Sequence, residues 1–204
     1  MSGLLTSASL EAAARRVCTM LEHRAAQFNE LDAATGDGDM GATLQIVARS
    51  ILANDEPFPA DLGEAFGRLA ASIAKTSGSS LSAVIMTGLM SLSRSAKGQR
   101  ECDVETFLRH LQPALETMQS RSRARFGDKT ILDGLKAMVE RGKGSTTLAE
   151  FGSRAADGVD GALVEFRGRP SQIGRARLSE NMGVGLDDPG MVVLSQVIAS
   201  LREG

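Results

Sequence analysis

Three aspartates and three glycines are crowded into the segment LDAATGDGDMGATL, residues 31–44. The carboxylates belong to Asp32, Asp37 and Asp39, which fall within eight residues of one another. The glycines make the backbone flexible enough for several hard oxygen ligands to converge on one point, which suits Mg²⁺ held by carboxylates and by the phosphates of a nucleotide. Without a cation the three charges would repel one another, so the alternative interpretation is a solvated acidic turn.

Two other motifs match this segment only in part. Gly36, Gly38 and Gly41 fit the G-x-G-x-x-G pattern. The residues before them have the periodicity of a helix rather than a strand, and acidic side chains inside the loop would repel a bare pyrophosphate. An EF-hand register that starts at Asp37 has Ala48 where glutamate is required. The sequence therefore favours neither a dinucleotide fold nor an EF-hand.

A second segment, AKTSGSSLSAV at residues 74–84, could bind phosphate. Ser77, Gly78, Ser79 and Ser80 stand immediately before an apolar helical stripe that starts at Leu81. Free backbone N–H groups and the positive end of a helix dipole attract phosphate at such a place. The alternative is ordinary capping of the helix by Ser79 or Ser80. A Walker A loop is absent, because the only Gly-Lys pair of the chain is followed by glycine instead of a hydroxyl residue.

Two further segments break the helical pattern. In FGDKTILDGL, residues 126–135, Asp128 and Thr130 precede a helix and Asp133 lies in its first turn, which local capping would also explain. In GRARLSENMGVGLDDPGM, residues 174–191, Arg175 stands in a polar loop that ends on Asp-Pro-Gly. A fixed guanidinium is a common phosphate clamp, although a solvated surface charge is the alternative.

The elements that must position these segments are helices, because apolar residues recur three or four apart in nearly every stretch of the chain. The stripes predict an all-α fold, an antiparallel up-and-down bundle or barrel of about eight helices in a single domain, residues 1–204. The first stripe runs from Leu10 to Leu31, the second helix opens near Thr43, and the last begins at Pro189. In such an arrangement the connections after the first, third, fifth and seventh helices lie at the same end. The four segments follow those helices, so their spacing predicts one composite site with metal, phosphates and an arginine.

Composition excludes several classes of function. The 204 residues carry a net charge of -2 and contain only 3% aromatics, all of them phenylalanine, which disfavours nucleic-acid binding. No apolar run approaches the roughly 20 residues of a membrane span, and the first residues lack the order of a signal peptide. We therefore expect a cytoplasmic protein with no nucleic-acid partner and no membrane span. Cys18 and Cys102 are expected to be reduced, buried thiols.

Together the motifs resemble those of the L subunit, or L domain, of dihydroxyacetone kinases. The family's GDGD-H-G loop is similar to residues 36–41, which Asp32 precedes and Thr43 follows. Its GD-R-T-hydrophobic-LD stretch is similar to residues 127–133, and its RASYLGERS-x-G-H-x-DPG stretch aligns without gaps on residues 175–190. The chain departs from the pattern at Met40 and Leu186, where many family members have histidine.

The resemblance implies an eight-helix barrel that holds ADP or ATP across the loops at one end, with two Mg²⁺ ions. Asp32, Asp37 and Asp39 would ligate the metal and, with Arg175, form the catalytic set. The residues implied to bind the nucleotide are Met40, Thr43, Ser77, Gly78, Ser79, Ser80, Leu81, Gly127, Asp128, Thr130, Arg175, Asp188, Pro189 and Gly190.

The family transfers a phosphoryl group to a small ketose, such as dihydroxyacetone, held on a separate K-type subunit. The donor is ATP, or a bound ADP that a phosphotransferase-system protein phosphorylates in place, and a homodimer is left open. No residue of this chain can be assigned to the sugar, so the acceptor site is expected on another chain. The alternatives are a regulatory module that holds ADP without transfer, which the changes at Met40 and Leu186 motivate, and a structural helical protein with acidic loops.

Overall fold

The computed structural model describes residues 3–75, 79–173 and 183–202, and this part of the chain is mainly helical. It contains nine α-helices and one short antiparallel pair of strands, in which Leu5 pairs with Cys102 and Thr6 with Glu101. In chain order the elements are β1 (Leu5–Thr6), α1 (Ser7–His23), α2 (Ala25–Ala33), α3 (Met40–Leu52), α4 (Leu62–Ala74), α5 (Ser80–Ser95), β2 (Glu101–Cys102), α6 (Val104–Arg121), α7 (Ile131–Gly142), α8 (Leu148–Arg167) and α9 (Pro189–Arg202).

Short polar side chains determine where several helices begin. Asp61 accepts a hydrogen bond from the backbone N–H of Glu64 at 2.9 Å, and Asp103 accepts one from Thr106 at 2.8 Å. These contacts satisfy N–H groups that the first turns of α4 and α6 leave without a helical partner. The loops of the chain therefore end at residues that the sequence marks as N-caps.

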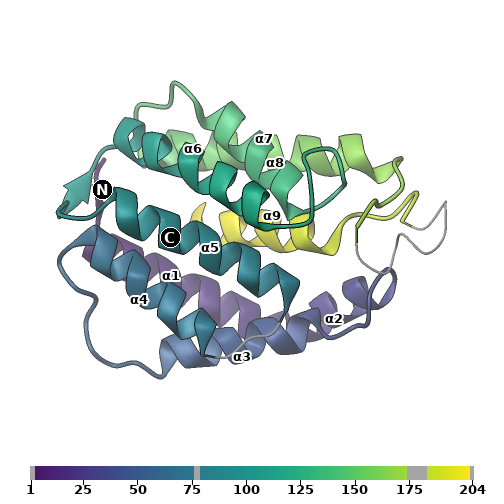
Figure 1. Cartoon of the computed structure of the whole chain (residues 1–204), viewed down its shortest axis with the longest axis horizontal. Coiled ribbons are helices and arrows are strands. Elements are labelled where there is room, and N and C mark those ends of the chain that lie inside the picture. Colours follow the sequence, from purple (N-terminus) through teal and green to yellow (C-terminus); the bar gives the residue numbers. More distant parts are fainter. Residues whose placement is uncertain (1–2, 76–78, 174–182, 203–204) are drawn as a thin grey trace.

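Eight of the helices form a closed ring. Each of α3 to α8 contacts the next helix along the chain, and α1 closes the ring by contacting both α9 and α3 (Figure 1). The described part of the chain has four clusters of buried apolar side chains. One lies among α6 to α9, one among α1, α2, α3 and α9, one around α4, α5 and α6, and a smaller one between α8 and α9. The predicted all-α up-and-down barrel is confirmed.

The ninth helix comes from a break in the first predicted stripe. Arg24 has φ -102° and ψ 8°, outside the helical region, and separates α1 from α2. Apolar periodicity continues across the break because Leu21 and Phe28 are buried in the same cluster. The next helix also begins at Met40, earlier than the expected opening near Thr43.

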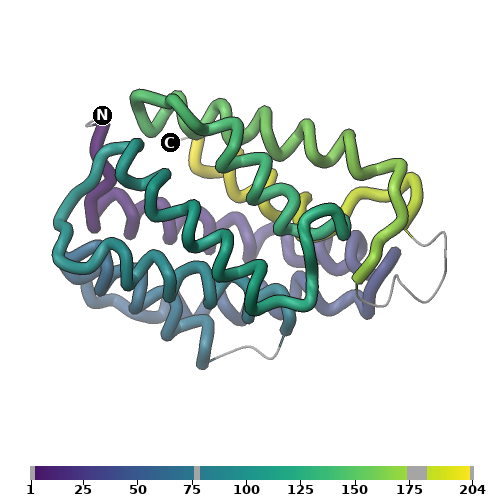
Figure 2. Tube along the Cα trace, turned by 45° about the horizontal axis from the view of Figure 1, so that its top comes forward, coloured from purple at the N-terminus to yellow at the C-terminus, as the bar shows by residue number. Residues whose placement is uncertain are grey.

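The arrangement places the predicted loops at one end of the barrel. The connections α2–α3, α6–α7 and α8–α9, together with the first turn of α5, lie toward the right in Figure 1, and the tube in Figure 2 shows the same end from a second direction. The turns at the opposite end join α3 to α4 and α7 to α8. Among the described helices, none combines the length and the apolar character needed to cross a membrane.

Candidate functional site

The acidic loop brings its three carboxylates together. Asp32 lies near the end of α2, whereas Asp37 and Asp39 lie in the turn before α3. One carboxylate oxygen from each residue lies within 4.8 Å of the others. Asp32 is partly buried and the other two are exposed, so the cluster faces solvent from one side. Spacing had predicted this convergence, and among the described residues these three are the only such group of potential metal ligands.

The backbone around the cluster leaves no room for larger side chains. The Oδ2 atom of Asp32 accepts hydrogen bonds from the N–H groups of Gly38 at 2.9 Å and Asp39 at 3.2 Å, which curls the loop around it. A Cβ atom on Gly36 would lie 2.4 Å from Oδ1 of Asp32, and one on Gly41 would lie 1.8 Å from the carbonyl oxygen of Ala25. The loop geometry therefore depends on glycine at both positions.

The donor set fits a hard divalent cation. Three carboxylates supply oxygen ligands, and their negative charges lie close enough for repulsion that a cation would relieve. In the first turn of α3, beside this loop, the N–H of Ala42 donates to Asn29 Oδ1 at 3.1 Å. Met40 starts the helix and packs against the core, and Thr43 is partly buried one turn later.

The second predicted segment is described at residues 74–75 and from Ser79 onward. Ser79 is the N-cap of α5, and its Oγ atom accepts from the N–H of Ser82 at 3.1 Å. Ser80 is exposed, while Leu81 is partly buried and packs against two core clusters. The capping interpretation is thus confirmed for Ser79. Ser77 and Gly78 lie outside the described residues.

The third segment is organised by Asp133. This carboxylate is 5% exposed and accepts from two backbone N–H groups, that of Gly127 at 2.6 Å and that of Thr130 at 2.9 Å. Thr130 in turn is the N-cap of α7, so the pair forms a capping box. Asp128 accepts from the N–H of Arg125 at 2.6 Å, and its carbonyl oxygen accepts from the N–H of Gln172 at 3.1 Å. Local capping, the alternative interpretation of this segment, is therefore present.

The fourth segment meets the third at the start of α9. Oδ2 of Asp188 accepts from the N–H of Met191 at 2.8 Å, and a Cβ atom on Gly190 would lie 3.1 Å from that of Ile131 at the start of α7. Burial, reinforced by the charge of Asp133, raises the pKa of Asp188 to about 7. Pro189 opens the helix as predicted. Arg175 lies outside the described residues.

Lys129, in the α6–α7 loop, was not predicted from the sequence to have a structural or functional role. Lys129 is 2% exposed, has a positive φ of 62°, and directs its ammonium group at three backbone carbonyl oxygens. The acceptors belong to Gly183 at 2.5 Å, Arg169 at 2.9 Å and Arg167 at 3.3 Å. Its only sequence signal was the position between Asp128 and Thr130, because periodicity does not show where a loop lysine points.

The structure joins the third and fourth segments directly and the acidic loop more remotely. Lys129 and the Gln172 bond connect the α6–α7 and α8–α9 loops. The acidic loop is connected to these two loops only indirectly, by packing on α9. There Val193 belongs to the cluster shared with α1 to α3, and Leu194 belongs to the cluster shared with α7. The acidic loop and the described parts of the third and fourth segments thus lie at one end of the barrel.

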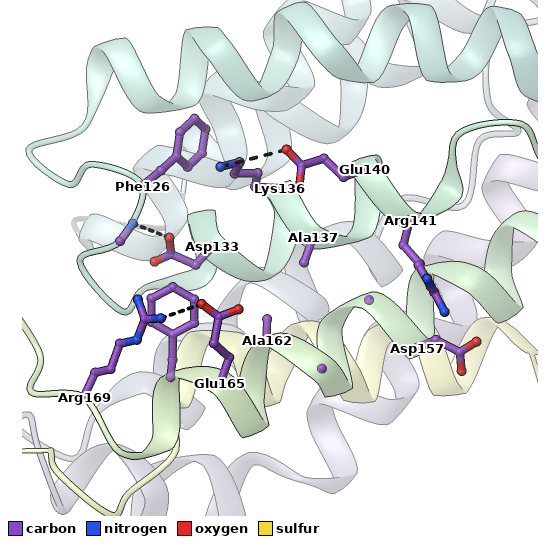
Figure 3. Close-up of a pocket in the computed structure, with 14 residues that line it drawn as sticks. Phe126, Asp133, Lys136, Ala137, Glu140, Arg141, Asp157, Ala162, Glu165 and Arg169 are labelled. Carbon is purple, nitrogen blue, oxygen red and sulfur yellow. Dashed lines mark hydrogen bonds and ion pairs between the residues drawn. The ribbon is translucent and has the colours of Figure 1, made fainter.

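A shallow groove of about 770 Å³ runs between α7 and α8, beside these loops (Figure 3). Its polar side chains pair with one another, as in the contacts of Lys136 with Glu140 at 3.9 Å and of Arg169 with Glu165 at 2.6 Å. Of the predicted site residues it contains only Gly127. The groove is therefore separate from the acidic cluster.

Known proteins of similar sequence include kinases. The mouse (Mus musculus) triokinase/FMN cyclase is 25% identical over 209 residues, which is 99% of this chain and 36% of that protein. The dihydroxyacetone kinase of Komagataella pastoris is 29% identical over 185 residues, covering 84% of this chain and 30% of that protein. The chain thus spans about one third of the length of these relatives.

Solved structures show the same fold. The native dihydroxyacetone kinase of C. freundii superposes with a TM-score of 0.76 at 21% identity, over 95% of this chain and 34% of that one. The same enzyme crystallised with AMP-PNP and Mg²⁺ gives a TM-score of 0.74 at 22% identity, with 95% and 33% covered. The DAK2 domain model matches residues 34–203, and the chain therefore belongs to the DAK2 domain family.

Proposed function

We propose that this chain is the nucleotide-binding part of a dihydroxyacetone-kinase-like phosphotransferase. It would hold ATP, or ADP that is phosphorylated in place, and pass a phosphoryl group to a small ketose on a separate K-type subunit. The observation that carries the proposal is the convergence of Asp32, Asp37 and Asp39 within 4.8 Å at the end of the barrel where the other loops meet. The structure of the C. freundii dihydroxyacetone kinase in complex with AMP-PNP and Mg²⁺, which has the same fold, supports it.

The aspartates would hold two Mg²⁺ ions, which supply the charge neutralisation that phosphoryl transfer requires. The chain's own residues do the positioning. Asp32 orients the loop by accepting two backbone N–H groups, and Asp37 and Asp39 present their carboxylates to solvent, where a nucleotide can approach. Thr130 and Asp188 fix the starts of α7 and α9, whose first turns lie side by side next to the same end. We also assign phosphate binding to Arg175, Ser77 and Gly78, which lie outside the described residues.

Calorimetry with AMP-PNP and Mg²⁺ tests the proposal. We expect saturable binding by the parent chain and its loss in Asp37→Ala. Asp55→Ala is the matched control, because it removes the same charge from an exposed residue in the α3–α4 connection at the other end of the barrel. Unchanged affinity in Asp37→Ala, or absence of binding by the parent chain, would overturn the assignment.

The second candidate is a module that holds ADP and docks to a partner without transfer. Two side chains favour it, since Met40 packs against the core and Leu186 is 43% exposed, and neither can donate or accept a proton as histidine does. Adding a cognate K-type subunit, dihydroxyacetone and ATP separates the two, because only a kinase produces the phosphorylated ketose. The nucleotide that copurifies identifies the donor, since tightly held ADP favours a phosphotransferase-system protein. A cytoplasmic location and a homodimer stay predictions.

A further inference from the structure

A single buried side chain connects the two loops to which we assign the nucleotide. Lys129 lies between Asp128 and Thr130 in the α6–α7 loop, and its ammonium group reaches across to the α8–α9 connection. A lysine ammonium has three N–H donors, and here three carbonyl oxygens receive them. The cation is thus fully hydrogen-bonded although it is 2% exposed.

The positions of the acceptors show what this contact does. Arg167 ends α8 and Arg169 lies just after it, at the first stem of the α8–α9 connection, whereas Gly183 belongs to the second stem, which leads to α9. The stems also bond to each other, because the carbonyl oxygen of Arg167 accepts from the N–H of Gly185 at 2.8 Å. Lys129 therefore fixes the spacing between two chain segments that are 14 residues or more apart in sequence. The second of these segments leads to Asp188.

The backbone of Lys129 is strained to make this reach. Its φ of 62° is in the left-handed region, and among the described non-glycine residues it is the only one with positive φ. That conformation is unfavourable for a residue with a Cβ atom, so the surrounding hydrogen bonds must outweigh it. The neighbours Gly127 and Thr130 are held by Asp133, which leaves the lysine stem pointing inward.

Exposed ion pairs near the same stems cannot replace this contact. Arg167 pairs with Asp187 at 2.8 and 2.7 Å, but the arginine side chain is 53% exposed, and solvent weakens such pairs. The buried ammonium is screened much less. Its removal would take the ammonium donor from all three carbonyl oxygens, of which those of Arg167 and Gly183 keep a backbone N–H donor, and the stems could then move apart from the α6–α7 loop.

We propose that Lys129 is a positioning residue for nucleotide binding, which sets the distance between the α6–α7 loop and the start of α9. The inference rests on the proposed function, because it assumes that these loops form the nucleotide pocket. Lys129 does not itself contact the nucleotide in this proposal. It acts by keeping Thr130 and Asp188 in their places.

Three variants test the inference. Lys129→Met removes the ammonium but keeps a long apolar stem, Lys129→Arg keeps a cation with several donors, and Lys136→Met removes the same charge from a side chain that is 44% exposed on α7. For AMP-PNP with Mg²⁺ we expect the Kd of Lys129→Met to rise by about tenfold or more, while Lys129→Arg stays within about threefold of the parent and Lys136→Met is unchanged. In a coupled kinase assay the same loss is expected in KM for ATP more than in kcat.

A second measurement does not require a nucleotide. Amide hydrogen exchange at Gln172 and Gly185, whose N–H groups bridge the loops and the stems, should accelerate in Lys129→Met and not in Lys136→Met. Lower thermal stability with unchanged Kd and unchanged exchange would show a purely structural lysine and overturn the inference. Failure of the parent chain to bind nucleotide would instead overturn the proposed function, and the exchange result would still decide whether Lys129 holds the loops. If Lys129→Met does not fold, Lys129→Gln, whose amide can still donate, is measured against the same criteria.

Discussion

The acidic loop lies at the same end of the barrel as the α6–α7 and α8–α9 loops that Lys129 connects, but the charged side chains of the two regions have different surroundings. Lys129 and Asp133 are both buried, and the lysine donates hydrogen bonds to backbone carbonyl oxygens while the aspartate accepts them from backbone N–H groups. In the acidic loop, three like charges gather, and two of them are exposed. The first region is complete without a ligand, whereas the second gains most from an added cation. Buried, satisfied charges indicate scaffold, and concentrated like charges indicate a binding function.

The largest effect should come from the backbone contact beneath the acidic loop. In Gly41→Ala the new Cβ atom would lie 1.8 Å from the carbonyl oxygen of Ala25, so α2 and α3 must separate. We expect the free energy of unfolding to fall by about 3 kcal/mol or more in urea denaturation. Gly161→Ala is the control, because nothing lies within 4 Å of a Cβ atom there and alanine favours helix. Equal stability of the two variants would contradict the close approach.

Removal of the buried carboxylate of the scaffold should come next. Asp133→Ala leaves the N–H groups of Gly127 and Thr130 without their acceptor and removes half of the capping box. The unfolding free energy is expected to fall by about 2 kcal/mol, with or without Mg²⁺. Asp133→Asn keeps one acceptor oxygen, so its unfolding free energy should lie between that of Asp133→Ala and that of the parent chain. If Mg²⁺ restored the stability of Asp133→Ala, the division between scaffold and metal site would be wrong.

The raised pKa of Asp188 gives the third prediction a definite sign. In the unfolded chain the carboxyl has its ordinary pKa of 3.8, and in the folded chain its pKa is about 7. The folded state therefore binds more protons between these values, and stability is lost as the pH rises through that window. Asp188→Asn removes the titration and keeps an acceptor for Met191. Relative to the parent chain, this variant should gain roughly 1 to 2 kcal/mol between pH 6 and pH 8. A stability difference that does not change with pH would contradict it.

The smallest effect distinguishes the acidic loop from an ordinary turn. In the absence of divalent ions, Asp37→Asn reduces the repulsion within the cluster, so we expect it to stabilise the chain by about 0.5 kcal/mol. Addition of Mg²⁺ should raise the Tm of the parent chain and leave that of the variant nearly unchanged. Asp55→Asn serves as the control with an equal change of charge on an exposed loop residue. If Mg²⁺ raised the Tm of the parent chain, Asp37→Asn and Asp55→Asn equally, the acidic loop would be a solvated turn and not a metal site.

Most of the fold could be predicted from local patterns. Apolar residues three or four apart predicted the helices, and the structure shows small polar residues capping some of their starts, as at Asp61 and Asp103. The break at Arg24 was missed because the apolar stripe continues through it, with Leu21 and Phe28 in one cluster. Hydrophobic periodicity reports which face is buried and does not report a single residue that leaves the helical region.

The candidate site also has some features that local sequence patterns predict and others that depend on contacts between distant residues. Asp32, Asp37 and Asp39 are at most seven positions apart, so sequence spacing limits how far apart they can lie, and their convergence was predictable. The contacts of Lys129 span 38 to 54 positions and could not be predicted, because a loop lysine is ordinarily solvated. Whether Ser79 caps α5 or binds phosphate also depended on the fold, and the structure shows the cap.

The sequence by itself determined the all-helical barrel, the acidic cluster and the end of the barrel at which the loops gather, because these follow from helical period, short-range spacing and the alternation of helix direction. Only the tertiary structure decided which charged groups are buried. The ammonium of Lys129 is stable inside because three carbonyl oxygens from distant parts of the chain surround it, and Asp188 has a raised pKa because α7 and α9 pack around it. Such environments are made by residues that are not neighbours in sequence.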